Sequence, residues 1–346
     1  MVFVSISARL LINVEALNMV ESIGNVTRHR RATVIVFDKN RNSYSKVEVP
    51  AISGESIAHA FQEALVLSAR TIYGDGAPIC AWCARGEFFK SMDNKHTMDA
   101  AKDIKNPAKF EEVIIKNCLV EDIGGFLRAD RPPVKRTSRF QVGYLVPTYD
   151  AISSTVLDTQ FHVRHAPSEV AKERKEKREE REVQAQMIYY VETGGAVYGF
   201  NMNIDIDGIG KTSMLEVKDV LSRDEREKRI RTVMSALLII LSSNMFGAKR
   251  TRFLPIIDVK SAIAAVSDPI PFTVAPAMNK DFIESTLRKR NRFLEVTKKL
   301  KIDENINLYA FSNEVEIPEG IVKVDSIEHL LECVTNDVLK LEGFIK

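Results

Sequence analysis

Residues 155–206 place the strongest constraint on how this chain can fold. Residues 155–164 and 186–206 are rich in β-branched and aromatic side chains, which predicts two strands. Between them, residues 168–182 hold six acidic and six basic side chains and almost no apolar ones. Such a run cannot enter a core, because it has little apolar surface to bury. We therefore predict a long hairpin with a solvated tip, which either contacts a partner or is a disordered loop without a role.

Length and composition exclude several protein classes. The 346 residues favour one large domain with insertions, or two domains. A hydrophobic content of 45% and a charged content of 28% are typical of globular proteins. No apolar run approaches the ~18 residues of a membrane span, and the N-terminus alternates like a strand instead of resembling a signal peptide, so we expect a cytoplasmic protein. The net charge of +2 neither requires nor excludes nucleic acid.

Hydrophobic periodicity predicts alternating strands and helices in the rest of the chain. We expect strands over 2–12, 33–37, 44–49, 141–164, 253–266 and 308–311, with a loop over 13–26. Two helices should follow the N-capping residues Ser53 and Ser222, the second ending near residue 246, and two more should cover 281–301 and 326–341. Residues 73–139 are interrupted by glycine and proline, which predicts an inserted subdomain.

The order of these elements indicates a fold class. When the insertion and the early hairpin are set aside, the chain reads strand, helix, two strands, helix, strand. This is the ferredoxin-like order, an α+β scaffold that RNA-recognition modules use.

Basic side chains gather in several segments. The densest, residues 27–31, reads TRHRR, and residues 247–252 read GAKRTR. Residues 126–140 combine arginines with two phenylalanines, a mixture suited to single-stranded nucleic acid. Free backbone N–H groups at the start of the first helix, beside Ser53 and Ser56, could also meet a phosphate. A solvated surface, or simple capping, is the alternative for each segment.

The cysteines give an incomplete metal motif. Cys80 and Cys83 have the spacing of metal ligands, but no second such pair follows. Cys118 and His96 would complete a zinc site only if the fold brought them there. We expect ordinary thiols, or a disulfide if the source is hyperthermophilic, and neither a metal nor a cofactor.

Two histidines leave a choice between catalysis and binding. His162 and His165 lie beside Arg164, which would suit general acid–base chemistry in a metal-independent ribonuclease. Cations alone would suit phosphate binding equally well. No acidic partner lies at a useful spacing, so binding is favoured.

Five segments together resemble the backbone subunit of archaeal type I-A CRISPR Cascade complexes, in the DevR-type branch of the repeat-associated mysterious protein superfamily. They run along almost the whole predicted core, in the order of that family. The segments are SARLLINVEALNMVESIGNVTRHRRA (7–32), ISGESIAHAFQEAL (52–65), QFHVRHAP (160–167), YYVETGGAVYGFNMNIDI (189–206) and FGAKRTRF (246–253).

The resemblance implies a fold and an assembly. The fold would be a modified ferredoxin-like, RNA-recognition-motif core shaped like a hand. Its palm would cover 1–72 and 140–266, an inserted helical finger subdomain 73–139, a β-hairpin thumb about 166–186, and an αβ appendage 267–346. Copies of the chain would form a helical filament on CRISPR RNA. The guide RNA that they hold would pair with target DNA, and the filament would contact other Cascade subunits and the nuclease-helicase effector. A metal-independent CRISPR endoribonuclease of the same superfamily is the alternative.

The resemblance, together with the basic segments, also implies which residues would contact RNA. No residue is expected to be catalytic, and Met187 and Ile188 are the expected apolar wedge of the thumb. The expected RNA contacts are Asn18, Ser22, Gly24, Asn25, Thr27, Arg28, His29, Arg30, Ser53, Ser56, His59, Arg136, Arg139, His162, Arg164, His165, Lys249, Arg250 and Arg252.

Overall fold

A computed structural model describes residues 1–15, 18–23, 26–38, 41–131, 133–165, 186–247, 250–251 and 253–346. For residues 14–15, 19–23, 164–165 and 186–188 the description extends to the backbone alone. The predicted hairpin tip, residues 168–182, lies outside these ranges.

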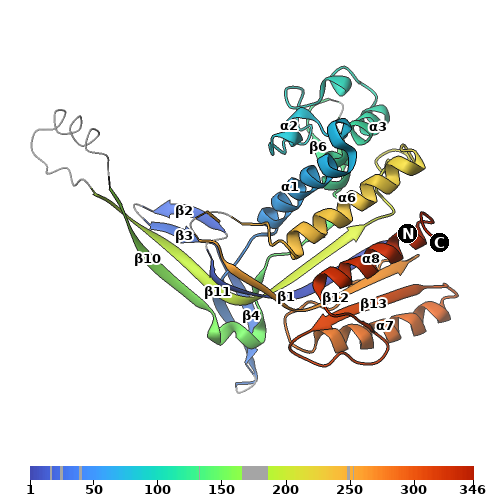
Figure 1. Cartoon of the computed structure of the whole chain (residues 1–346). Helices are drawn as coiled ribbons and strands as arrows, with labels where there is room; N and C mark the ends of the chain where they lie inside the picture. Colours follow the sequence, from blue (N-terminus) through green and yellow to red (C-terminus); the bar gives the residue numbers. More distant parts are fainter. Residues whose placement is uncertain are drawn as a thin grey trace, which may run out of the picture.

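Among the described residues, ten strands form one large mixed sheet with β1 near its middle (Figure 1). β1 pairs antiparallel with β11 on one side and with β12 on the other. In spatial order the strands are β14 (Val322–Lys323), β13 (Asn305–Ser312), β12 (Ile256–Asp268), β1 (Phe3–Glu15), β11 (Gln186–Asp205), β3 (Val26–His29) and β2 (Met19–Ile23). Three more strands pair with β11 off this path: β8 (Phe140–Val142), β9 (Val146–Pro147) and β10 (Val156–His165).

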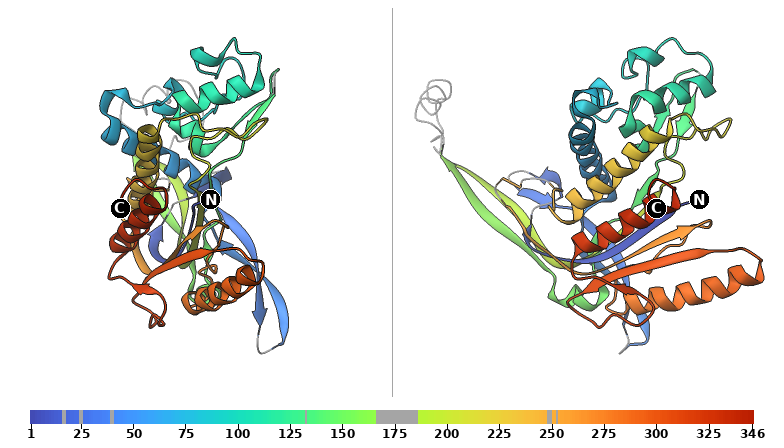
Figure 2. Two further views of the ribbon diagram at one scale, coloured as in Figure 1. Left: turned by 90° about the vertical axis from the view of Figure 1, so that its right-hand side faces the viewer. Right: turned by 45° about the vertical axis from the view of Figure 1, so that its right-hand side comes forward.

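Helices cover both faces of the sheet. α1 (Gly54–Tyr73), α6 (Arg223–Leu241) and α8 (Ile327–Leu341) lie on one face, and α7 (Phe282–Lys299) lies on the other (Figures 1 and 2). β12 is buried on both faces, with Ala264 and Val266 in the core of the first three helices and Ile263 and Ala265 in the core beside α7. This is the period of two that a strand imposes on its side chains.

β1 shows the same alternation with a different chemistry on its second face. Its apolar residues join the main core: Val4, Ile6, Ala8, Leu10 and Ile12. The intervening residues are buried and polar. Ser5 Oγ donates to Asn203 Oδ1 and Ser7 Oγ to Asn201 Oδ1, both at 2.7 Å. These bonds are needed, because an unsatisfied buried polar group costs about 1–3 kcal/mol.

Arg9 completes the polar face of β1. Its side chain is 1% exposed and binds two carboxylates, Asp150 at 2.8 Å and Glu314 at 2.8 Å. Asp150 lies in η3 (Tyr149–Ser154), and Glu314 follows β13. The guanidinium therefore ties the central strand to two segments that are far from it in sequence.

A subdomain of small elements follows α1. It has its own core of Ala101, Phe110, Ile114, Phe126 and Val134. Its elements are η1 (Gly74–Gly76), α2 (Ala81–Ala84), η2 (Asp99–Ala101), α3 (Pro107–Asn117), α4 (Leu119–Gly124), β6 (Phe126–Arg128) and β7 (Val134–Arg136), and a separate hairpin, β4 (Arg31–Asp38) and β5 (Ser43–Pro50), precedes α1. No helix in the described part of the chain is long and apolar enough to cross a membrane.

Several sequence predictions are confirmed. The early hairpin forms as β4–β5, and the two capped helices begin where expected. Ser53 Oγ accepts from Ser56 N, and Ser222 Oγ accepts from Glu225 N, each at 3.2 Å. These side chains satisfy backbone donors that have no partner within the helix.

Three predictions of element bounds are wrong. Residues 141–164 are not one strand: β8, β9 and β10 are separate, and the 3-10 helix η3 lies between the last two. Residues 13–26 are not a simple loop: β1 continues to Glu15, and β2 and β3 follow. Pairing of β3 with β11, as at Thr27 and Val191, depends on residues remote in sequence and therefore overrides local preference. α6 ends at Leu241 and not near 246, because Asn244 has a φ of 51°, in the left-handed region that a helix cannot include.

A buried ionic cluster joins the small subdomain to α6 and to the segment after β11. The carboxylate of Asp122 binds both Arg136 and Arg229, and it accepts from Gly210 N at 3.1 Å. All three charged side chains are fully buried. Arg136 also donates to the carbonyls of Lys211 at 2.6 Å and Gly208 at 3.1 Å. These bonds occupy the polar atoms that burial would otherwise leave without partners.

We predict that Asp122→Ala lowers the free energy of unfolding by about 3–5 kcal/mol, because it leaves two buried guanidinium groups without their carboxylate. Chemical denaturation at constant ionic strength measures this change. Glu227→Ala is the matched control, because Glu227 forms an ion pair with Arg231 at 2.7 Å on the partly exposed side of α6. It should cost no more than about 0.5 kcal/mol. Equal losses in the two variants would contradict a structural role for the cluster.

Candidate nucleic-acid interface

The β2–β3 segment is attached to the start of α1. Asn18 makes the connection: its Oδ1 accepts from Ser53 N at 2.7 Å, and its carbonyl accepts from Arg30 N at 2.8 Å. The Arg30 carbonyl accepts in turn from Ala51 N at 2.9 Å. The densest basic segment is therefore fixed beside the N-terminus of α1, the end of a helix at which the dipole favours negative charge.

Two arginines of this segment differ in exposure. Arg28 on β3 is exposed. Arg30 is half-buried, donates to the Tyr144 hydroxyl at 3.3 Å and lies 6.0 Å from the centre of that ring. Tyr144 is itself 42% exposed, so a cation and an aromatic ring are presented together at the surface. Single-stranded nucleic acid is bound by this combination, through its phosphates and its bases.

A cavity of about 410 Å³ lies between α1 and the segment after α6. Ser56, His59 and Glu63 line it from α1, and Phe246 and Arg250 line it from the other side. His59 Nε2 lies 3.4 Å from a Glu63 oxygen, and its ring is 5.0 Å from that of Phe88. The fold thus brings Ser56, His59 and Arg250 together, although almost two hundred residues separate the two segments in the sequence.

His162 lies on β10 among aromatic rings. It stacks on Tyr189 of β11 with 5.2 Å between ring centres, and its edge meets Phe253 at 5.3 Å. Its Nε2 is buried and forms no hydrogen bond with the described residues. Phe253 closely follows Arg250 in the chain, so the part of the β10–β11 hairpin that holds His162 and Tyr189 lies next to the loop that lines the cavity.

For most of the remaining predicted RNA contacts, the structure describes the backbone alone or does not describe the residue. Arg164 and His165 end β10, in register with Met187 and Gln186 of β11, and Ile188 is in register with Val163. Ser22 is in register with Thr27, which is half-buried. The side chains of Ser22, Arg164, His165, Met187 and Ile188 are not described, and Gly24, Asn25, Lys249 and Arg252 lie outside the described residues.

Two predicted RNA contacts are wrong. Arg136 is fully buried, and its guanidinium is occupied by Asp122, Glu111 and two carbonyls, so it cannot reach a phosphate. His29 is 2% exposed, and its Nδ1 lies 2.8 Å from the Arg30 carbonyl. Arg139 is only 12% exposed and binds Asp205 at 2.9 Å. Basic residues in a loop-like sequence therefore serve here to hold the interior together.

Sequence reasoning missed Glu192 and Tyr144. Glu192 is buried in β11, accepts from His29 N at 3.1 Å and binds Arg31 at 3.0 Å. It thereby fixes β3 against the long hairpin. A single acidic residue in the apolar run YYVETGG could have predicted a basic partner, because buried carboxylates are almost always paired.

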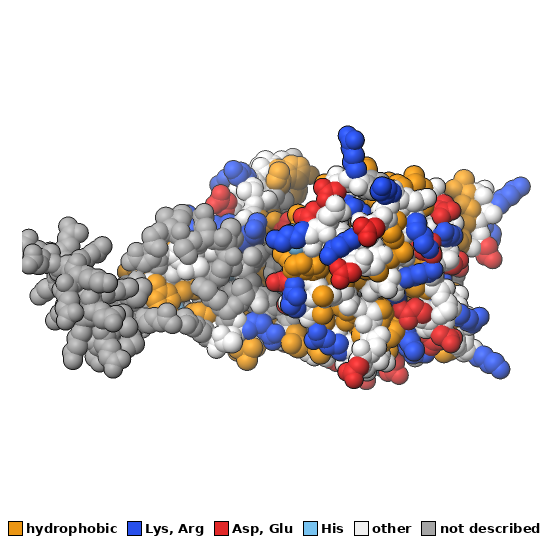
Figure 3. Space-filling view, turned by 90° about the horizontal axis from the view of Figure 1, so that it is seen from above, with side chains coloured by type: hydrophobic (Ala, Val, Ile, Leu, Met, Phe, Trp, Pro, Cys, Tyr) orange, Lys and Arg blue, Asp and Glu red, His pale blue; other side chains and the backbone are white. Residues whose placement is uncertain are grey.

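The surface seen from above shows how charge is distributed elsewhere (Figure 3). On the described part of that face, cationic and anionic side chains are interspersed. It therefore does not present a field of one sign that would attract a polyanion.

Within the described residues, one buried group has the chemistry to hold a metal ion: Cys80, Cys83, Cys118 and Glu121, where α2 meets α4.

Comparisons with known proteins agree over most of the chain. The family described as CRISPR-associated negative auto-regulator DevR/Csa2 matches residues 6–287. The "CRISPR-associated aCascade subunit Cas7/Csa2 2" of Saccharolobus solfataricus is 34% identical over 340 residues, which cover 95% of this chain and 98% of the relative. The "CRISPR-associated protein Cas7/Cst2/DevR" of Methanocaldococcus jannaschii is 28% identical over 329 residues, which cover 94% and 97%.

Solved structures share the fold. A chain of a "CRISPR RNA-guided surveillance complex, pre-nicking" superposes with a TM-score of 0.53 at 10% identity, over 97% of this chain and 99% of the other. A chain of a "CRISPR RNA-guided surveillance complex" gives a TM-score of 0.50 at 11% identity, with the same coverage. The identities to these structures establish the fold alone, whereas the family match spans most of the sequence. The chain therefore belongs to the DevR/Csa2 family of CRISPR-associated proteins.

Proposed function

We propose that this chain is the CRISPR RNA-binding backbone subunit of a type I-A Cascade interference complex. Copies line up along one guide RNA, hold its phosphate backbone and leave bases free to pair with target DNA. The observation that carries the proposal is the nearly full-length match, at 34% identity, to a relative that is itself named an aCascade subunit. The shared fold with chains of surveillance complexes supports the same role.

We infer that the core is a modified ferredoxin-like, RNA-recognition-motif fold. The order β1, α1, β10, β11, α6, β12 supports this, as does the neighbour order β12-β1-β11-β10. In this arrangement residues 1–72 and 140–266 are the palm, 73–139 the finger subdomain, about 166–186 the thumb, and 267–346 an appendage.

The hairpin supports the thumb assignment by its length. β11 has 20 residues, which corresponds to about 65 Å of strand at about 3.3 Å per residue. Its second half lies in the central sheet beside β1, and its first half extends away from the body with β10 (Figures 1 and 2). A strand shared in this way couples the position of the thumb to the palm. Met187 and Ile188 stay the proposed wedge.

The proposed RNA surface consists of three described parts: the cations Arg28 on β3 and Arg30 just after it, the cavity of Ser56, His59 and Arg250, and the ring of His162. A protein that accepts any guide should contact phosphate and sugar and avoid the base edges that carry sequence. A few cations per copy bind weakly, but repetition along one strand multiplies the affinity. A net charge of +2 is compatible with this arrangement.

We propose that the chain does not cleave RNA and that target DNA is cut by a separate nuclease-helicase. The second candidate function is a metal-independent CRISPR endoribonuclease, since relatives of this superfamily include such enzymes. The surroundings of His162 argue against it. A general base must lie within hydrogen-bond reach of the proton it removes, whereas Nε2 of this partly exposed ring is buried against neighbouring groups that include Tyr189 and Phe253.

The first prediction of this proposal concerns affinity. Arg28→Ala combined with Arg30→Ala should weaken the binding of two guide RNAs of unrelated sequence by the same factor. The slope of log affinity against log salt should fall by about 1.4, since each phosphate contact on a single strand contributes about 0.7. Fluorescence anisotropy titrations at several salt concentrations measure both quantities.

The matched control is Arg288→Ala with Arg292→Ala, which removes two exposed cations from α7. Affinity should stay unchanged in this variant. An unchanged affinity in the Arg28 and Arg30 variant would remove that segment from the interface, and an equal loss in the control would move the interface to α7.

The second prediction separates binding from catalysis. Labelled CRISPR RNA incubated with the protein should be protected from added nuclease at regularly spaced segments and should not be cleaved by the protein itself. The His162→Ala variant, and the control His329→Ala on α8, should likewise protect regularly spaced segments and should not cleave the RNA. Cleavage that is lost in the His162 variant, and kept in the His329 variant, would instead establish the endoribonuclease.

A further inference from the structure

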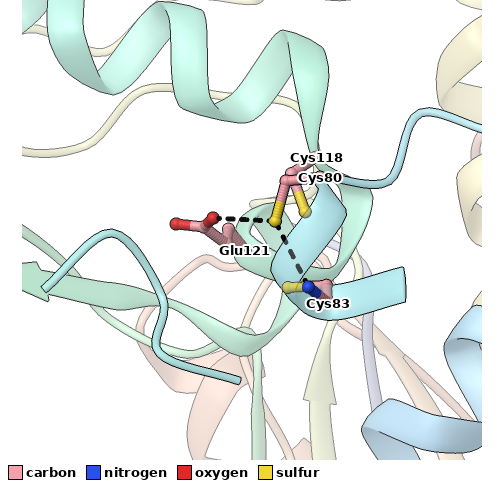
Figure 4. Close-up of side chains that lie close together, drawn as sticks. All are labelled: Cys80, Cys83, Cys118 and Glu121. Carbon is pink, nitrogen blue, oxygen red and sulfur yellow. Dashed lines mark hydrogen bonds between the residues drawn. The ribbon is translucent and has the colours of Figure 1, made fainter. Parts of the chain in front are cut away.

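Three cysteines and one glutamate meet inside the subdomain that follows α1 (Figure 4). Cys80 is the N-cap of α2, and Cys83 lies in that short helix. Cys118 lies between α3 and α4, and Glu121 belongs to α4. One donor atom from each of the four residues lies within 4.8 Å of all the others. The C-x-x-C spacing is repeated as Cys118-x-x-Glu121, which places both pairs on the first turn of a short helix.

Burial makes this group unusual. Cys83 and Cys118 are 0% exposed, Glu121 is 1% exposed and Cys80 is 8% exposed. Glu121 Oε1 lies 3.5 Å from Cys80 Sγ, and Glu121 Oε2 forms no hydrogen bond with the described residues, although the Ser91 side chain is near enough to stabilise the carboxylate. A buried carboxylate with so few partners costs free energy unless further hydrogen bonds or a ligand satisfy it.

One basic side chain lies beside the group. Lys90 supplies a positive charge near Cys83 and Glu121, and its ammonium donates to the Gly124 carbonyl at 3.0 Å. Three thiolates and one carboxylate carry more negative charge than a divalent cation neutralises, and Lys90 would offset part of the excess.

We propose that Cys80, Cys83, Cys118 and Glu121 bind one zinc ion in a tetrahedral site. With Zn–S about 2.3 Å and Zn–O about 2.0–2.2 Å, tetrahedral donors lie about 3.5–3.8 Å apart. The distance of 3.5 Å between Cys80 Sγ and Glu121 Oε1 falls in this range. The other donor–donor distances are at most 4.8 Å, so small side-chain shifts would bring these atoms to tetrahedral spacing. Thiolates select zinc over magnesium and calcium, which prefer oxygen ligands alone. Binding releases the protons of the three thiols and of any protonated carboxyl.

The site is structural, because four protein ligands leave no open position for a substrate. It joins α2 to the α3–α4 junction. α4 has only six residues, and a helix of this length is not stable in isolation. The residue after Glu121 is Asp122, whose carboxylate holds Arg136 and Arg229. The zinc therefore fixes the short helix from which the buried ionic cluster is built.

His96, the other candidate ligand in the sequence, is engaged elsewhere. Its Nδ1 lies 2.8 Å from the Asp93 carboxylate, and its ring packs against Trp82 and Phe89 at 5.0 and 4.2 Å. The fourth donor is Glu121, which lies one helical turn after Cys118.

The first test measures metal content in the unmutated full-length protein. The chain, purified under reducing conditions without a polyhistidine tag, should carry about one zinc per molecule by inductively coupled plasma mass spectrometry. Replacement by Co²⁺ should give the visible absorption bands and the sulfur-to-metal charge transfer of a tetrahedral thiolate site. A protein refolded in excess zinc that carries no metal, or that shows a disulfide among Cys80, Cys83 and Cys118 by mass spectrometry, would overturn the proposal.

The second test uses variants in a chelator competition. Glu121→Gln keeps the shape of the side chain and removes its charge. It should weaken zinc binding at least about tenfold, the loss typical even of an outer-shell partner. Cys333→Ser alters the half-buried cysteine of α8 and should leave affinity and stoichiometry unchanged. Unaltered affinity in the Glu121 variant would exclude Glu121 as a ligand and with it the proposed donor set. Neither test depends on RNA binding.

Discussion

The alternation of β1 between two chemically different faces is the constraint on which the rest of the structure depends. One face is apolar and joins the core beneath α1, α6 and α8. The other is a buried polar ladder of Ser5, Ser7 and Arg9 whose partners lie on β11, in η3 and after β13. A shift of one residue would exchange the two faces and bury Arg9 among aliphatic side chains. The register of the central strand is therefore fixed, and with it the positions of β11 and β12.

β11 carries this constraint to the candidate RNA surface. Its second half pairs with β1 and its first half with β10, so the hairpin continues the central sheet. Glu192 on this strand holds the basic segment through His29 N and Arg31, and Asn18 holds the same segment against the start of α1. The cations that face solvent are thus supported by buried hydrogen bonds, which keeps their spacing constant from one copy of the chain to the next.

The small subdomain that follows α1 also depends on buried polar pairings. Its helices are too short to be stable alone, and its apolar core is small. Buried polar groups supply the missing order: Asp122 gathers two arginines and, in our proposal, Glu121 and three cysteines gather a zinc ion. These two adjacent acidic residues of α4 organise different neighbours. The subdomain is therefore held by specific pairings more than by apolar area.

The sequence by itself determined the elements whose signals are local: the capped starts of α1 and α6, the β4–β5 hairpin, the alternation of β1, and the family, through segments distributed along the core. Only the tertiary structure decided which basic residues are accessible. Arg28 is exposed while Arg136 and His29 are buried, although all three stand in similarly polar stretches. It also decided that Cys118 and Glu121 join Cys80 and Cys83. The physical reason is that capping and alternation are set within a few residues, whereas burial and ligand geometry depend on groups that folding brings together from distant parts of the chain.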